Sequence, residues 1–130
     1  MRRLLSAAES GNVEAQFNLG VLYDNPLDDN GHAIKGNRAE AMRWLLLAAE
    51  HGLARAQCKL AELYAQPPAR RRDQSEACTW FLVAARTSSG IHRRKAQIGY
   101  QQVVSRMTPP QIEKAKRRAL AWKPTRPLTD

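Results

Sequence analysis

The chain repeats its own sequence at a nearly constant interval. A block that begins at Ala8 returns 41 positions later, and a second block, which contains Trp44, returns 36 positions later. The first block reads Ala-x-x-Gly-x-x-x-Ala-Gln at residues 8–16 and 49–57, and the second reads Glu-Ala-x-x-Trp-x-x-x-Ala-Ala at 40–49 and 76–85. Self-similarity of this period, with apolar residues at helical spacing, is typical of stacked helix pairs. Because such a repeat uses its shared residues for packing, it predicts a binding surface rather than an active site.

Turn-forming residues divide the chain into short helices. We expect a partial helix over residues 3–10, unit one over 12–51, unit two over 53–87 and a degenerate capping unit over 90–122, all in one domain. Gly11 predicts a left-handed helix stop, and Asn37 with Glu40 predicts a helix start. The second helix of unit two is expected to start at Asp73, and the last helix to follow the capping sequence Thr108 to Gln111. Residues 123–130 are expected to form a frayed tail. The prediction is an all-α protein of six to seven helices.

The third unit is out of register with the first two. Ala85 and Ala96 are 11 residues apart, whereas Ala8 and Ala15 are 7 residues apart, so the linker around Ser88 is expected to hold a four-residue insertion (11 minus 7). In the first two units, small alanines let the helices of each pair approach closely. The large residues Tyr23, Trp44, Tyr64 and Trp80 are expected to fill the core between layers.

Composition bounds the class of protein. The 130 residues contain no apolar run long enough to cross a bilayer, and Glu9 interrupts the first apolar stretch too early for a signal peptide, so we expect a cytoplasmic protein. Cys58 and Cys78 lack metal-binding spacing; they are interpreted as two buried thiols, with a disulfide between helices as the alternative. The charge is uneven: residues 1–65 carry 7 basic and 8 acidic side chains, residues 66–130 carry 14 and 4. A basic second half favours an acidic partner.

These residues resemble the SEL-like repeat (SLR) family, which is related to the tetratricopeptide solenoids. The similar pattern includes Gly11, Leu19, Tyr23 and Trp44 in the first unit and its equivalents in the second. The resemblance implies a right-handed α–α superhelix and a bacterial-type scaffold or adaptor that binds a partner protein or peptide in a concave groove. Arg3 stands where the family has tryptophan, so the first layer is expected to be uncovered at Leu4, Leu5, Ala7 and Ala8. Either two chains pair through these residues or the chain is a fragment of a longer repeat array.

Motifs that carry chemistry are missing from the sequence. The three histidines do not form a zinc-binding pair, no Ser-x-x-Lys nucleophile occurs, and no phosphate-binding glycine loop is present. Residues 28–31 resemble a calcium loop only superficially, because the alternating ligands and the closing glutamate are missing. We therefore expect a protein that is not an enzyme and uses no metal or cofactor.

Two surfaces remain as candidate sites. The first is the concave face of the repeats, whose candidate residues are Gln16, Asn18, Asp24, Gln57, Lys59 and Gln97. The recurring glutamines could equally form structural hydrogen bonds, and both readings stay open here. The second is a basic patch, made of Arg70, Arg71, Arg72, Arg93, Arg94, Lys95, Lys114, Arg117 and Arg118. This patch is interpreted as a solvated surface or as a site for an acidic protein, and the alternative function is binding of nucleic acid or another anionic surface.

Overall fold

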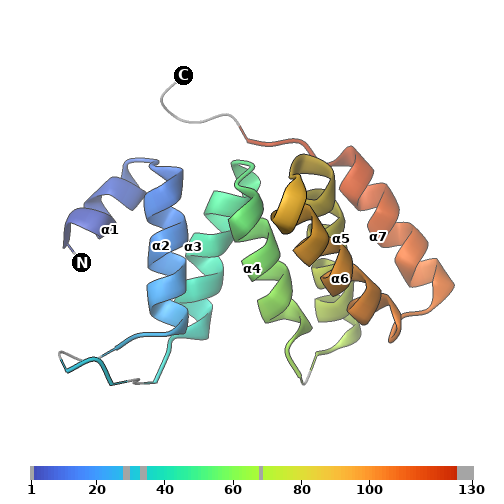
Figure 1. The fold of residues 1–130 in the computed structure, drawn as a ribbon, viewed down its shortest axis with the longest axis horizontal. Helices are drawn as coiled ribbons and strands as arrows, with labels where there is room; N and C mark the ends of the chain where they lie inside the picture. The colour runs from blue at the N-terminus through green and yellow to red at the C-terminus, as the bar shows by residue number, and fades with distance from the viewer. Residues whose placement is uncertain (1, 28–29, 33–34, 68, 126–130) are drawn as a thin grey trace.

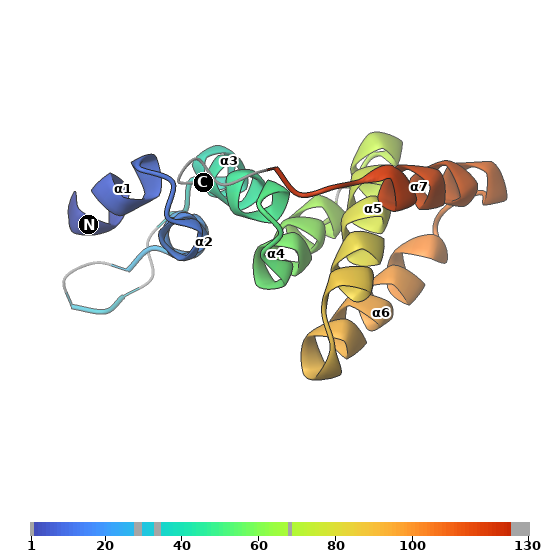
Figure 2. The ribbon, with the colours of Figure 1, turned by 90° about the horizontal axis from the view of Figure 1, so that it is seen from above.

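The computed structural model describes residues 2–27, 30–32, 35–67 and 69–125. These residues form seven helices, which confirms the all-α prediction. The helices are α1 (Arg2–Glu9), α2 (Val13–Asp24), α3 (Arg38–Glu50), α4 (Ala54–Ala65), α5 (Arg71–Thr87), α6 (Gly90–Val104) and α7 (Pro109–Ala121). They stand side by side along the long axis of the molecule in the order of the sequence (Figure 1). Seen from above, α2, α4 and α6 lie on one side and α1, α3 and α7 on the other, and α5 runs from beside α7 to the start of α6 (Figure 2).

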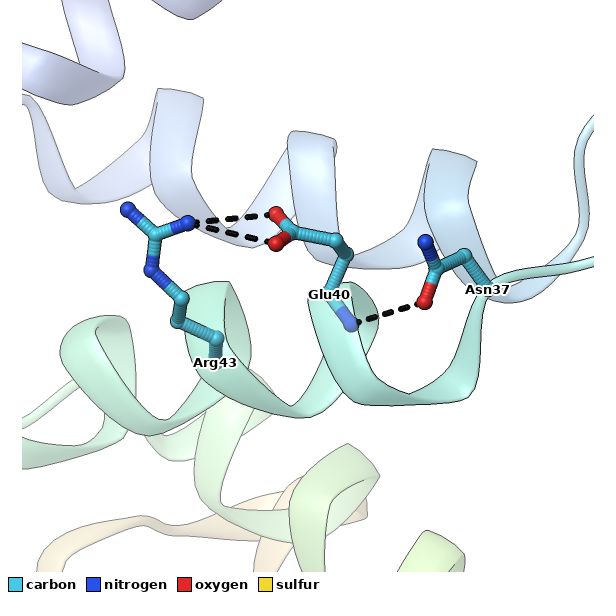
Figure 3. Close-up of polar contacts among 3 residues, drawn as sticks. All are labelled: Asn37, Glu40 and Arg43. Carbon is cyan, nitrogen blue, oxygen red and sulfur yellow. Dashed lines mark hydrogen bonds and ion pairs between the residues drawn. The ribbon is translucent and has the colours of Figure 1, made fainter.

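The caps predicted at Asn37 and Gly11 are both present. Asn37 accepts a hydrogen bond from the backbone N–H of Glu40 at 3.1 Å, and Glu40 pairs with Arg43 at 3.3 Å (Figure 3). The Asn37 side chain thus satisfies one of the amide groups that a helix start leaves unpaired. Gly11 has a φ of 99°, the left-handed conformation expected of a helix stop.

The core is built as the repeat predicts. The alanines at 41, 48, 49, 77 and 84 are fully buried, so the helices of each pair can approach closely. Trp44 and Trp80 are 3% and 7% exposed, which confirms that they fill the core, whereas Tyr23 and Tyr64 are only partly buried at its edge. In the first layer Ala8 is buried with Trp44, and Leu4 and Leu5 pack against this cluster. Ala8 is therefore not part of an exposed face.

The helices of the second half depart from the expected bounds. Helix α5 begins at Arg71, two residues before Asp73, because Asp73 caps the helix from its third position: its carboxylate accepts from the Arg70 N–H at 3.2 Å. Helix α6 begins at Gly90 and has 15 residues where α2 and α4 have 12. The four-residue insertion is thus largely absorbed as an extra helical turn.

The first residues of the tail are ordered, which corrects the prediction of a frayed tail for residues 123–125. The ring of Trp122 meets that of Trp80 edge to face, with centroids 6.1 Å apart. The Arg86 guanidinium donates to the carbonyls of Leu120 and Trp122 at 3.2 and 2.9 Å. Beyond these contacts the chain crosses back over the helix ends (Figure 1), and the Thr125 N–H donates to the carbonyl of Glu50, the last residue of α3, at 2.7 Å. Residues 126–130 lie outside the described residues.

Candidate functional site

Two of the three repeated glutamines belong to the core. The Nε2 of Gln16 donates to the carbonyl of Ala8 at 3.2 Å, and that of Gln57 to the carbonyl of Ala49 at 3.0 Å. The two side chains are 3% and 0% exposed. Each hydrogen bond joins the start of one helix to the end of the helix before it, and adds a second donor to a carbonyl that also accepts from the N–H of Gly11 or Gly52. These two residues are therefore structural, which corrects their assignment to a binding surface.

Two further predicted groove residues pair with each other. Asp24 at the end of α2 and Lys59 in the middle of α4 form an ion pair of 3.1 Å. At the other end of α2, Glu14 pairs with Arg55, whose guanidinium lies over the ring of Phe17, 5.1 Å from its centroid. These contacts join α2 to α4 across the boundary between units, so they account for the charges without a ligand. Asn18 and Gln97 are exposed, and their role in binding stays a prediction.

A hollow lies between α4 and α6. Its volume is about 540 Å³, and Phe81, Val103 and Ala65 supply its apolar lining. Glu62, Gln66, Gln102 and Arg106 are exposed and form its polar rim. We call this the α4–α6 groove. None of the six residues predicted for the concave face lines it.

Gly99 is the residue that lets this groove form. A β-carbon on Gly99 would lie 2.3 Å from Cε1 of Phe81, so only glycine allows α6 to pack directly on that ring. Phe81 directly follows Trp80, at the position that Leu45 holds after Trp44, and the larger ring of unit two meets a residue without a side chain. The sequence did not reveal the groove, because the contact of Phe81 with Gly99 joins two units across the insertion. A bulky residue in one repeat and an isolated glycine in the next were the available signals.

The basic patch divides into separate surfaces. Arg72 in the first turn of α5 and Lys114 and Arg118 on α7 line a hollow of about 250 Å³ together with Glu76. Arg118 pairs with Glu76 at 2.7 Å. Arg93, Arg94 and Lys95 lie on α6, near the opposite end of α5 from Arg72. The structure therefore brings the basic residues of 70–72 and 114–118 together, but those of 93–95 lie elsewhere.

The remaining candidates for chemistry are structural. Cys58 and Cys78 are free and buried, so the interpretation as two thiols holds and the disulfide does not form. Burial raises the pKa of each thiol from 9.0 to about 11, which makes both poor nucleophiles at neutral pH. Within the described residues, no group of three or more histidine, cysteine, aspartate or glutamate side chains is placed to hold a metal ion. Asp28 and Asp29 lie outside the described residues. None of the helices that the structure describes is both long and apolar enough to cross a bilayer.

Comparison with known proteins agrees with this architecture. The Sel1 repeat profile matches residues 13–53 and 54–86, which are the two helix pairs α2–α3 and α4–α5 with their connections. The chain belongs to the Sel1 repeat family. Proteins built from Sel1 repeats are generally protein-interaction modules and generally not catalysts. Membership of this family also explains why the side chains that recur in both repeats are mostly the ones that pack in the core.

Two solved structures resemble the chain over most of its length. One is a protective antigen of uropathogenic Escherichia coli strains that displays an SLR fold, with a TM-score of 0.74 and 27% identity. It matches over 92% of this chain, which spans only 24% of that protein. The other is a Sel1 repeat protein from Oxalobacter formigenes, with a TM-score of 0.54 and 31% identity over 93% of this chain and 97% of that one. No curated protein sequence matches the chain.

Proposed function

We propose that this Sel1 repeat protein is a non-enzymatic scaffold that holds a segment of a partner protein in the α4–α6 groove. The observation that carries the proposal is the lining of that groove: an apolar floor with Phe81 and Val103 below a rim of polar side chains. Apolar lining with a few polar groups is the usual composition of a site that anchors one side chain of a ligand. The groove replaces the predicted concave-face residues as the proposed site.

The position of the groove indicates which chemistry its ligand carries. Helices α4 and α6 both end here, at Ala65 and Val104, and the C-terminal end of a helix carries partial negative charge. Glu62 adds a carboxylate to the rim, and Arg106 is the one lining cation. We therefore expect the partner segment to insert an apolar side chain and to offer hydrogen-bond donors around it.

The proposal is tested by filling the groove. Gln102→Trp places a large ring at the rim, and Gln101→Trp, on the adjacent exposed position of α6 that does not line the groove, is the matched control. Both chains are used to select a random dodecapeptide library displayed on phage, in parallel with the unmodified chain. We expect peptides selected by the unmodified chain to bind Gln101→Trp equally and Gln102→Trp at least tenfold more weakly. Equal binding to all three chains would contradict the proposal.

Three predictions from the sequence stay open beside it. Binding of nucleic acid through the basic half would appear as an affinity that falls linearly with salt on a log–log plot. Pairing of two chains through α1 would appear in light scattering and be lost in Leu5→Asp, since Leu5 is only partly buried there. A cytoplasmic location remains a prediction of the sequence alone.

A further inference from the structure

Helices α5 and α7 lie in a register that is the same at three successive turns. Glu76 pairs with Arg118, and the ring of Trp80 meets that of Trp122; both pairs are 42 residues apart in sequence. The same offset of 42 residues places Arg72 level with Lys114, one turn earlier, and these two side chains line the 250 Å³ hollow together. The surface between the helices, which we call the α5–α7 seam, thus has three levels: two cations, an ion pair and an aromatic pair.

The first level of the seam has an excess of positive charge. Among the described residues that line its hollow, Glu76 has the one carboxylate, and this group already pairs with Arg118 at 2.7 Å. Asp73, beside Arg72 in sequence, is turned to the Arg70 N–H. Arg72 and Lys114 therefore face a common hollow as like charges, and an anionic group between them would relieve their repulsion. Arg72 also lies in the first turn of α5, where the helix itself favours negative charge.

The third level of the seam offers an apolar contact. A second hollow of about 310 Å³ is lined by Thr79, Trp80, Ala121 and Trp122. Arg118 lines both hollows and forms the wall between them. Eight residues of helix separate the level of Arg72 from that of Trp80, which corresponds to about 12 Å at 1.5 Å per residue. An extended peptide covers that distance in about four residues.

We propose that the α5–α7 seam binds an extended segment of a protein partner that carries an acidic side chain and, three or four residues away, an apolar one. The acidic group enters the hollow of Arg72 and Lys114, and the apolar side chain packs on Trp122. A nucleic acid fits this surface less well, because its phosphates are closely spaced and one of them would lie beside the Glu76 carboxylate. The third level of the seam is also apolar rather than cationic. The seam lies between α5 and α7, and its lining shares no residue with the α4–α6 groove.

The probes are synthetic nonapeptides titrated against the full chain by calorimetry at low salt. One peptide carries glutamate and leucine at positions i and i+4, a second has glutamine in place of glutamate, and a third has the two residues adjacent. The test variant is Arg72→Glu with Lys114→Glu. The matched control is Arg71→Glu with Lys116→Glu, which makes the same charge change on the same two helices outside the hollow. Acidic residues in the first turn of α5 favour the helix, so both variants are expected to fold, and circular dichroism checks this.

We expect the i, i+4 peptide to bind at least tenfold more tightly than the other two. The test variant should lose that difference, and the control should keep it within about twofold, the scatter expected of surface substitutions. Gln102→Trp, which fills the groove, should leave this binding unchanged, so the seam and the groove can fail separately. The proposal is overturned if no peptide binds, if the glutamine peptide binds equally, or if both charge variants behave alike. It is also overturned if a single-stranded 12-mer oligonucleotide binds more tightly than every peptide and loses affinity in the test variant.

Discussion

Arg93 donates from Nε to the backbone carbonyl of Ala85 at 2.9 Å, eight residues before it. The buried glutamines of the first two units donate to Ala8 and Ala49 at the same separation of eight residues. In the third unit the insertion moves Gln97 four positions too far along, and it is exposed. An arginine of the predicted basic patch therefore performs the structural task of the missing glutamine. One hydrogen bond between consecutive helices is kept in all three units, although the residue type changes.

Gln57→Ala tests the structural role of the glutamines. The substitution removes two hydrogen bonds, from Gln57 Nε2 to the carbonyl of Ala49 at 3.0 Å and from the hydroxyl of Thr87 to Gln57 Oε1 at 3.1 Å, and leaves a cavity in a closed core. We expect the free energy of unfolding in urea to fall by about 2–4 kcal/mol. Gln97→Ala in the third unit is the control, with an expected change within about 0.5 kcal/mol because the side chain is exposed. Equal effects would show that burial of Gln57 does not contribute to stability.

Gly99→Ala tests the close approach of α6 to Phe81. Alanine favours a helix by up to about 1 kcal/mol over glycine. The new β-carbon would lie 2.3 Å from the Phe81 ring, however, and overpacking of this kind costs about 1–3 kcal/mol. We expect Gly99→Ala to destabilise the chain, but to stabilise it in a Phe81→Val background, where the clashing ring atoms are missing. Urea unfolding of the four chains of this double-mutant cycle measures the change of sign. If Gly99→Ala has the same effect in both backgrounds, the packing argument is wrong.

Trp122→Ala tests whether the tail stabilises the solenoid. The substitution removes the edge-to-face contact with Trp80 and loosens the segment that reaches Glu50. We expect a loss of about 1–3 kcal/mol in urea unfolding. Thr125→Pro, which removes the N–H that donates to Glu50 and keeps the Trp122 ring, should cost less, up to about 1 kcal/mol. A Trp122→Ala chain with unchanged stability would mean that residues 123–125 do not contribute to the fold.

The two buried thiols make stability fall at alkaline pH. Burial raises the pKa of Cys58 and Cys78 to about 11 in the folded chain, whereas the thiols of the unfolded chain titrate near 9.0. Between these values the unfolded chain loses protons that the folded chain keeps, so the free energy of unfolding decreases as pH rises from about 9 to 11. The contribution is fully present below pH 9. Burial also raises the pKa of Tyr64, which acts in the same direction.

Unfolding in urea at pH 8, 9, 10 and 11 measures this dependence. The variant Cys58→Ala with Cys78→Ala is the comparison, and its stability should decline less steeply over the same range. A thiol reagent at pH 8 provides a second readout: we expect slow reaction in buffer and fast reaction in urea. Fast reaction of the folded chain with two equivalents of reagent would contradict the burial of both side chains.

The sequence by itself determined the repeat, the helix pairs, the caps at Asn37 and Thr108 and the buried Trp44 and Trp80. Each of these depends on residues a few positions apart along one helix, or on a motif that returns at a constant interval, so spacing alone reveals it. It also limited the chemistry, since the motifs of a metal or nucleophile site can be recognised without coordinates.

Only the tertiary structure decided which side chains are exposed and which face each other. Gln57 and Lys59 lie two residues apart on one helix, yet the first is buried against Ala49 and the second pairs with Asp24 of the neighbouring unit. The α4–α6 groove and the α5–α7 seam arise where helices of different units meet, and their geometry depends on an insertion, a glycine and a tail that folds back. Contacts between units depend on the register of whole helices, which no periodicity within a single helix encodes.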